Sequence, residues 1–211
     1  QSDLVSIGGV APIILYHAKT QEVITIAGLG WWPRKADVNY FVREHNGAIP
    51  TGLMRTVVPA APDAWITALK RFGTKPFAEV AAAAIRFARD GFPMNPLYHG
   101  TVSNHIDDYR EFPAHAELFL RDGEPYAVGE NFKQTDAGAA LQHMADQEQA
   151  ALAAGASRQA GLEAARVAFY AGDIADTIVR YHHEHGGWLT HEDLAEYYSQ
   201  VSAPEQSSFG D

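Results

Sequence analysis

The sequence predicts an α/β (α+β) protein in which one β-hairpin accompanies a large helical part. Two observations lead to this class. β-Branched residues gather in two short runs near the N-terminus, whereas nearly everything after residue 36 has the periodicity of helices. A lone two-stranded hairpin is only marginally stable in water, and the rest of the sequence offers no further strand to extend it. The chain therefore fits a layered α/β structure better than an all-helical bundle.

The expected elements follow the chain in a simple order. The strands are Pro12–His17 and Val23–Ala27, and the polar segment 18–22 between them supplies the turn of the hairpin. Helices are expected over about 36–46, 62–72, 77–90, 94–109, 135–152, 159–169, 173–185 and 191–199. The alanine-rich segment 150–165 with its two glycines fits either a helical hairpin or a mobile loop.

The helix over 77–90 has the clearest pattern. Gly73 is expected to end the preceding helix in the left-handed conformation, and Thr74 with Pro76 starts the next helix. Apolar residues then recur at a spacing of three and four, which predicts one buried face. These residues are Phe77, Val80, Ala81, Ala84, Ile85 and Ala88.

Local signals also mark the later helix starts. Thr190 followed by Asp193 has the spacing of a capping box, and Asp173 is expected to cap the helix that begins at Ile174. The tail 201–211 is polar and lacks the alternation of a closing strand. We expect it to be extended, as in a truncated or disordered end.

Composition narrows the function classes. A net charge of −10 argues against binding to a nucleic-acid backbone, which relies on clustered Lys and Arg. No apolar run approaches the roughly 20 residues that a membrane-spanning helix needs. Cysteine is absent, which excludes disulfides and thiol nucleophiles. We therefore expect neither nucleic acid nor a membrane as a partner, while a cytoplasmic and a periplasmic location both fit.

Three short motifs carry a more specific message because they occur in collinear order. The segment 68–93 contains, in succession, a helix end, the turn Phe-Gly-Thr-Lys-Pro and an alanine-rich helix ending in Gly-Phe. Segment 168–175 reads Ala-Phe-Tyr-Ala-Gly-Asp-Ile-Ala, and segment 186–195 reads Gly-Gly-Trp-Leu-Thr-His-Glu-Asp-Leu-Ala. Together they resemble the large subunit of the gamma-glutamyltranspeptidase family, and the resemblance covers about residues 8–198.

The resemblance implies the αββα sandwich of the N-terminal-nucleophile hydrolases. In this superfamily a precursor, or zymogen, cleaves itself, and the newly exposed Thr attacks an amide with its own α-amine as base. The implied activity is hydrolysis of amides or acyl transfer.

The resemblance also implies a division into subunits. In the family that Thr begins the small subunit, so we expect residues 1–211 to be a single, incomplete large-subunit domain with no catalytic residue. The expected partners are a small subunit that carries the Thr, in a heterodimer or a dimer of heterodimers, and a small-molecule amide substrate. No cofactor is implied.

The resemblance also places part of the substrate wall just after the second strand. Members that act on γ-glutamyl groups have there an Asp-x-Arg-Glu-x-x-Pro stretch, whose Arg grips the substrate α-carboxylate. Alignment on the proline sets 27–33 against it, with Leu29 in the place of the arginine. A leucine cannot bind a carboxylate, so an apolar or aromatic acyl group is expected. The candidate substrate-binding residues are Leu29, Gly30, Trp31, Trp32 and Arg34.

Other interpretations stay open at this stage. Trp31 and Trp32 are equally consistent with large core residues, and Arg34 or Lys35 offers a replacement cation, as a carboxylate-binding module would require. Three histidines at 182, 183 and 185 suggest a metal, but they diverge on a helix, so no metal site is expected. The alternative to an enzyme is a non-catalytic helical interaction protein that retains the family scaffold.

Overall fold

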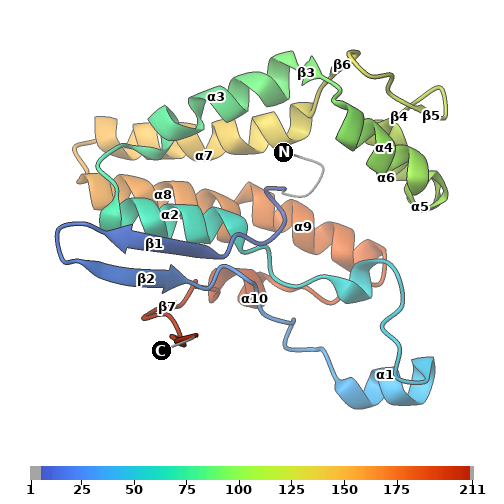
Figure 1. Cartoon of the computed structure of the whole chain (residues 1–211), viewed down its shortest axis with the longest axis horizontal. Helices are drawn as coiled ribbons and strands as arrows, with labels where there is room; N and C mark the ends of the chain where they lie inside the picture. The colour runs from blue at the N-terminus through green and yellow to red at the C-terminus, as the bar shows by residue number, and fades with distance from the viewer. Residues whose placement is uncertain (1–5, 210–211) are drawn as a thin grey trace.

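The computed structural model describes residues 6–209. Four of its helices are stacked in two layers on one side of the β1–β2 hairpin (Figure 1). Helices α3 (Phe77–Asp90) and α7 (Thr135–Ala153) form the outermost layer. Helices α2 (Ala61–Phe72) and α8 (Arg158–Tyr170) lie between that layer and the hairpin. The predicted combination of one hairpin with a large helical part is what the chain adopts.

The sheet has a third strand that the sequence did not predict. Strands β1 (Ile13–His17) and β2 (Glu22–Ile26) pair antiparallel as expected, and β7 (Val201–Ser202) pairs antiparallel with the free edge of β2. The expectation that nothing after residue 36 extends the sheet was therefore wrong. A strand of two residues is too short to show the alternation by which strands are recognised in a sequence.

The main core lies between the helical layers. On α3, the residues Phe77, Ala81, Ile85 and Ala88 are buried, as the spacing predicted. Val80 and Ala84 were assigned to the same face but are exposed, Val80 to 50%. The buried stripe is narrower than predicted because α7 covers α3 from one side only (Figure 1).

The segment after α3 forms a second, smaller cluster. The helix expected over 94–109 is broken at His105 into α4 (Pro96–Asn104) and α5 (Ile106–Glu111). Ile106 and Tyr109, which follow the break, pack against a buried cluster that includes Tyr98 and Phe132. The remaining elements of this region are α6 (Pro113–Phe119), β3 (Phe92–Pro93), β4 (Leu120–Arg121), β5 (Glu124–Pro125) and β6 (Asn131–Phe132).

Two predicted helix ends differ in detail. Gly73 has φ −82° and ψ 161°, an extended rather than left-handed conformation, and its N–H bonds the carbonyls of Ala68 and Leu69. A Cβ at Gly73 would lie 3.0 Å from the Cα of Leu69, which explains the glycine by space. Helix α9 (Asp173–Glu184) includes Asp173 as its first residue, so the cap is Gly172.

The other ends agree with the sequence or resolve its alternatives. The segment 150–165 is a helical hairpin, since α7 ends at Ala153 and α8 begins after the cap Ser157. The capping box of Thr190 and Asp193 is confirmed at the start of α10 (His191–Ala195). The last helix was predicted to continue to residue 199, but it ends at Ala195.

The connection from β2 to α2 contains α1 (Val38–His45) and the short 3-10 turn η1 (Leu53–Arg55). Among the described residues, no helix has the length and apolar character needed to cross a membrane.

Candidate functional site

The turn that follows β2 is held tightly by its backbone. Gly28 and Gly30 have φ of +51° and +77°, which favours glycine over residues with a Cβ. A Cβ at Gly30 would lie 2.3 Å from the carbonyl oxygen of Val58. The neighbouring Val58 N–H donates to the carbonyl of Trp31 at 2.8 Å. The turn therefore packs directly on the strand-like segment before α2.

The large side chains of this turn point outward. Leu29, Trp31 and Trp32 are 56%, 46% and 43% exposed in this chain. Neither tryptophan is a buried core residue of the chain, which disfavours that alternative. Trp31 meets the ring of Tyr197 edge to face at 5.2 Å between centroids, and Trp32 meets Phe41 in the same way at 6.1 Å.

An apolar hollow of about 400 Å³ opens beside Trp32. Helix α1, which Asp37 caps at its N-terminus, forms the opposite wall through Val38, Phe41 and Val42. The lining residues are Trp32, Ala36, Val38, Phe41, Val42, Gly47 and Ile49. None of them carries a charge, so the hollow suits an apolar group.

Arg34 lies on the turn, but its cation is directed away from that hollow. Its guanidinium pairs with Glu192 at 2.6 Å and with Glu196. The hydrogen bonds to Glu196 and Glu192 raise the pKa of Arg34 above its ordinary value. Neither Arg34 nor Lys35 lines the hollow beside Trp32, so the arrangement required of a carboxylate-binding module is not present there.

The segment around α10 supports the turn from the other side. The Arg34 backbone N–H donates to Asp193 Oδ1 at 3.0 Å, while Asp193 Oδ2 serves the capping box with Thr190. The Ala27 N–H donates to the carbonyl of Gln200 at 2.8 Å. The turn is thus fixed by residues that follow it by more than 150 positions, as the separation of 159 for Arg34 and Asp193 illustrates.

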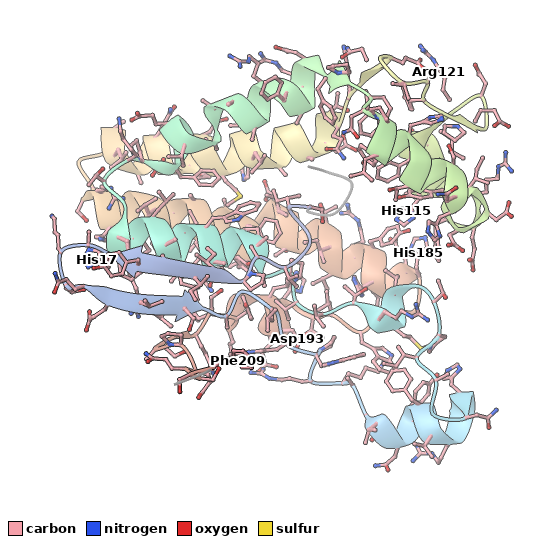
Figure 2. All side chains as sticks on the ribbon, viewed as in Figure 1. His17, His115, Arg121, His185, Asp193 and Phe209 are labelled. Atoms are coloured by element: carbon pink, nitrogen blue, oxygen red, sulfur yellow. The ribbon has the colours of Figure 1, made fainter. Side chains whose placement is uncertain are left out.

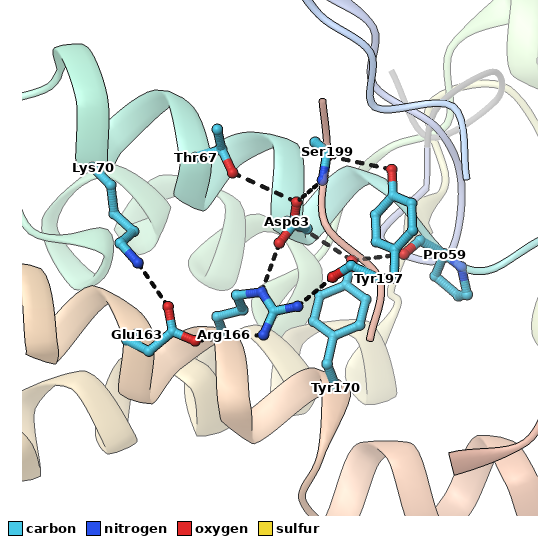
Figure 3. A network of polar contacts seen from close by, with 9 residues as sticks. All are labelled: Pro59, Asp63, Thr67, Lys70, Glu163, Arg166, Tyr170, Tyr197 and Ser199. Carbon is cyan, nitrogen blue, oxygen red and sulfur yellow. Dashed lines mark hydrogen bonds and ion pairs between the residues drawn. The ribbon is translucent and has the colours of Figure 1, made fainter. Parts of the chain in front are cut away.

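A buried polar network anchors that supporting segment (Figure 3). Asp63 on α2 and Arg166 on α8 form an ion pair at 2.6 Å, with side chains 0% and 5% exposed. Asp63 Oδ2 accepts the Ser199 N–H at 2.6 Å, and Arg166 Nη2 donates to the Tyr197 carbonyl. Burial raises the pKa of the Tyr170 hydroxyl, which donates to the Pro59 carbonyl at 2.6 Å. These groups lie too far apart in sequence for any motif to have joined them.

The histidines near the end of α9 do not converge. His182 is buried, and burial lowers the pKa of its imidazole below the ordinary value. His183 and His185 are exposed. Within residues 6–209, no three histidine or acidic side chains are grouped as ligands for a metal ion.

A second, wider cleft was not predicted. It measures about 1100 Å³ and lies between the loop after α1, helix α6 and the end of α9. His115 and His185, both labelled in Figure 2, face it together with His45, Phe112 and Tyr181. The residues come from three distant segments, and of them the sequence singled out only His185, as part of the histidine group for which no metal site was expected.

Known proteins are similar to this chain in sequence and in fold. A glutathione hydrolase-like YwrD proenzyme of Bacillus subtilis (strain 168) is 26% identical over 208 residues, covering 98% of this chain and 36% of its own length. An acylase ACY 1 proenzyme of Pseudomonas sp. (strain SE83) is 29% identical over 158 residues, covering 75% of this chain and 25% of its own length. The crystal structure of a cephalosporin acylase from Bacillus halodurans matches with a TM-score of 0.78 and 25% identity, over 96% of this chain and 36% of that one.

The fold class is that of the N-terminal-nucleophile hydrolases, here mostly helical with small sheets. The model of the gamma-glutamyltranspeptidase family matches residues 1–211, and the chain belongs to this family. The resemblance drawn from the three motifs is thereby confirmed. The chain spans only about a third of the length of the first of these relatives, at 36%, and 25% of the second.

Proposed function

We propose that this chain is the scaffold and substrate-wall part of an autoprocessed amidohydrolase or acyltransferase that acts on an apolar acyl group. Membership of the gamma-glutamyltranspeptidase family supports the reaction class, and relatives carry the names glutathione hydrolase and acylase. The choice of acyl group rests on Leu29, which alignment on Pro33 sets against the family's carboxylate-binding arginine, and on the uncharged hollow beside Trp32.

The proposed reaction uses a nucleophile outside residues 1–211. The hydroxyl oxygen of an N-terminal Thr attacks the amide carbonyl carbon, and the Thr α-amine takes the hydroxyl proton. The C–N bond then breaks, the leaving amine takes that proton, and the acyl group stays on Thr as an ester. Water or a second amine attacks the ester, which gives hydrolysis or transfer. No residue of this chain takes part in bond making.

The role of this chain is to hold the acyl group. Leu29 and Trp31 would form the face nearest the turn, and Trp32 with Phe41 would take the apolar end in the 400 Å³ hollow. A small hollow of this kind buries a short aliphatic or aromatic group, at about 25 cal/mol for each Å² of apolar surface removed from water. Arg34 belongs to the support of the wall, because two carboxylates already pair with it.

The proposal is tested with the full-length protein and a panel of acyl anilides. We expect aliphatic and aromatic acyl anilides to turn over faster than γ-glutamyl anilide. Leu29→Arg is expected to raise the relative rate on γ-glutamyl anilide, because it returns a guanidinium to the wall. Phe87→Ala is the matched control, since Phe87 is 50% exposed on α3 away from the turn. Preferred turnover of γ-glutamyl anilide by the unaltered protein would overturn the choice of acyl group.

Autoprocessing is tested separately. Mass spectrometry of the purified full-length protein is expected to give two polypeptides, the second beginning with Thr. Replacement of that Thr by Ala should leave one uncleaved, inactive chain. A single chain in the unaltered protein would instead favour the non-catalytic helical interaction protein.

A further inference from the structure

We propose that Tyr197 is a positioning residue for the substrate wall, and that its hydroxyl and ring set the orientation of Gly30 and Trp31. The inference rests on the proposed function, because the wall is the surface on which the acyl group would bind. It concerns a residue that follows α10, far along the chain from the turn, as the separation of 167 residues from Gly30 shows.

The contacts on the wall side come first. The Gly30 N–H donates to Tyr197 Oη at 3.3 Å, and the Tyr197 ring meets Trp31 edge to face at 5.2 Å. The Trp31 carbonyl accepts from the Val58 N–H at 2.8 Å. The peptide group that precedes Gly30 and the peptide group that follows Trp31 are therefore held, and Tyr197 supplies one of these two contacts. Without it, the indole loses its fixed direction.

The hydroxyl of Tyr197 has a defined polarity. Because the Gly30 N–H can only donate, Oη accepts there, and its own proton is free for Ser199 Oγ at 3.3 Å. Replacement by phenylalanine keeps the ring and its contact with Trp31. It leaves the Gly30 N–H without this acceptor, which loosens the turn.

The other side of Tyr197 is rigid, as a positioning role requires. The residue is 1% exposed, and its carbonyl accepts from Arg166, which is paired with the buried Asp63. Two residues further along the chain, the Ser199 N–H donates a hydrogen bond to Asp63 Oδ2 at 2.6 Å (Figure 3). The buried ion pair thus fixes the backbone on which Tyr197 stands.

If Tyr197 had a purely structural role, its replacement would affect only stability. Tyr170 offers a comparison that distinguishes this role from a positioning role. Tyr170 is fully buried in the same network and its ring stacks on Tyr197 at 6.1 Å, but its hydroxyl bonds Pro59 and Asp63 rather than the turn. Tyr170→Phe is therefore the same chemical change without the contact to the wall. It should lower stability and leave substrate preference unchanged.

The experiment compares these variants in the full-length protein with an aromatic acyl anilide and an acetyl anilide. For Tyr197→Phe we expect KM for the aromatic substrate to rise about fivefold, the effect of one lost hydrogen bond, with kcat for the acetyl substrate unchanged. Hydrogen exchange at the Gly30 amide should accelerate by a similar factor. Tyr170→Phe should produce neither change.

The outcomes are distinguishable. If Trp31→Ala alters the preference for aromatic acyl groups but Tyr197→Phe does not, the positioning role is wrong and the proposed wall stands. If Trp31→Ala has no effect, the wall itself is wrong. If Tyr197→Phe fails to fold, Trp31→Phe weakens the same ring contact from the exposed side and should shift KM in the same direction. An equal rise in KM for the aromatic substrate in Tyr170→Phe would mean that Tyr197 acts only as a core residue, and the positioning role would be wrong.

Discussion

Asp63 and Arg166 lie 103 residues apart in sequence and form a buried ion pair with 2.6 Å between Oδ1 and Nε. Each partner also contacts the backbone of the segment that follows α10, since Asp63 Oδ2 accepts the Ser199 N–H and Arg166 Nη2 donates to the Tyr197 carbonyl. The guanidinium also lies 3.6 Å from the ring centre of Tyr198. A single pair thus joins α2, α8 and the support of the candidate wall.

Removal of one partner of this pair should be costly. Arg166→Met leaves the Asp63 carboxylate buried without its cation, and we expect a loss of about 3–5 kcal/mol in the free energy of unfolding. The control is Lys70→Met, which breaks the partly exposed pair between Lys70 and Glu163 and should cost about 1 kcal/mol or less. Urea denaturation measures both. Equal losses would contradict a special role for the buried pair.

Glu148 provides a second test of buried charge. Its carboxylate is 0% exposed and accepts the N–H groups of Phe77 and Ala78 at 2.8 Å each, which caps α3 from the neighbouring helix. Glu148→Ala removes both acceptors, and we expect a loss of about 2–4 kcal/mol. Asp146→Asn, an exposed change on the same helix, should leave the urea midpoint nearly unchanged. If the two variants unfold at the same urea concentration, the cap contributes little.

Local patterns predicted the parts of the fold that depend on neighbours in sequence. The stripe on α3 and the capping box of Thr190 and Asp193 are both spaced by one helical turn, so they are visible in the sequence. Glu148 and Asp63 were not recognised, because an acid on a helix ordinarily indicates a solvated face or a first turn. Their partners lie 71 and 103 residues away.

The candidate site was likewise predicted only in those parts that neighbouring residues in the sequence determine. The resemblance placed Leu29, Trp31 and Trp32 on one turn, and the structure has them there with roughly half of each side chain exposed. It did not indicate that Arg34 pairs with Glu192 and Glu196, or that α1 forms the far side of the hollow. Those contacts depend on how distant segments pack, which spacing alone does not record.

His182 makes stability depend on pH. Burial lowers the pKa of its imidazole below the ordinary value of 6.5, and its Nδ1 has no hydrogen-bond partner among the described residues. The unfolded state therefore binds more protons as pH falls below about 6.5, so stability is full above that pH and declines below it. His182→Gln should flatten the decline, and His183→Gln, exposed on the same helix, should not. Thermal melts from pH 7.5 to 5 measure this; an unchanged decline in His182→Gln would assign it to other groups.

Gly30 and Gly186 separate backbone strain from lack of space. Their φ angles are +77° and +76°, so an added side chain strains both backbones alike. A Cβ at Gly30 meets the Val58 carbonyl oxygen at 2.3 Å, whereas a Cβ at Gly186 meets nothing within 4 Å. Gly186→Ala should therefore cost about 1–2 kcal/mol and Gly30→Ala clearly more, because the turn must also move away from Val58. Urea denaturation compares the two. Equal losses would mean that the turn shifts freely, and a wall that shifts freely would not hold Trp31 in place for a substrate.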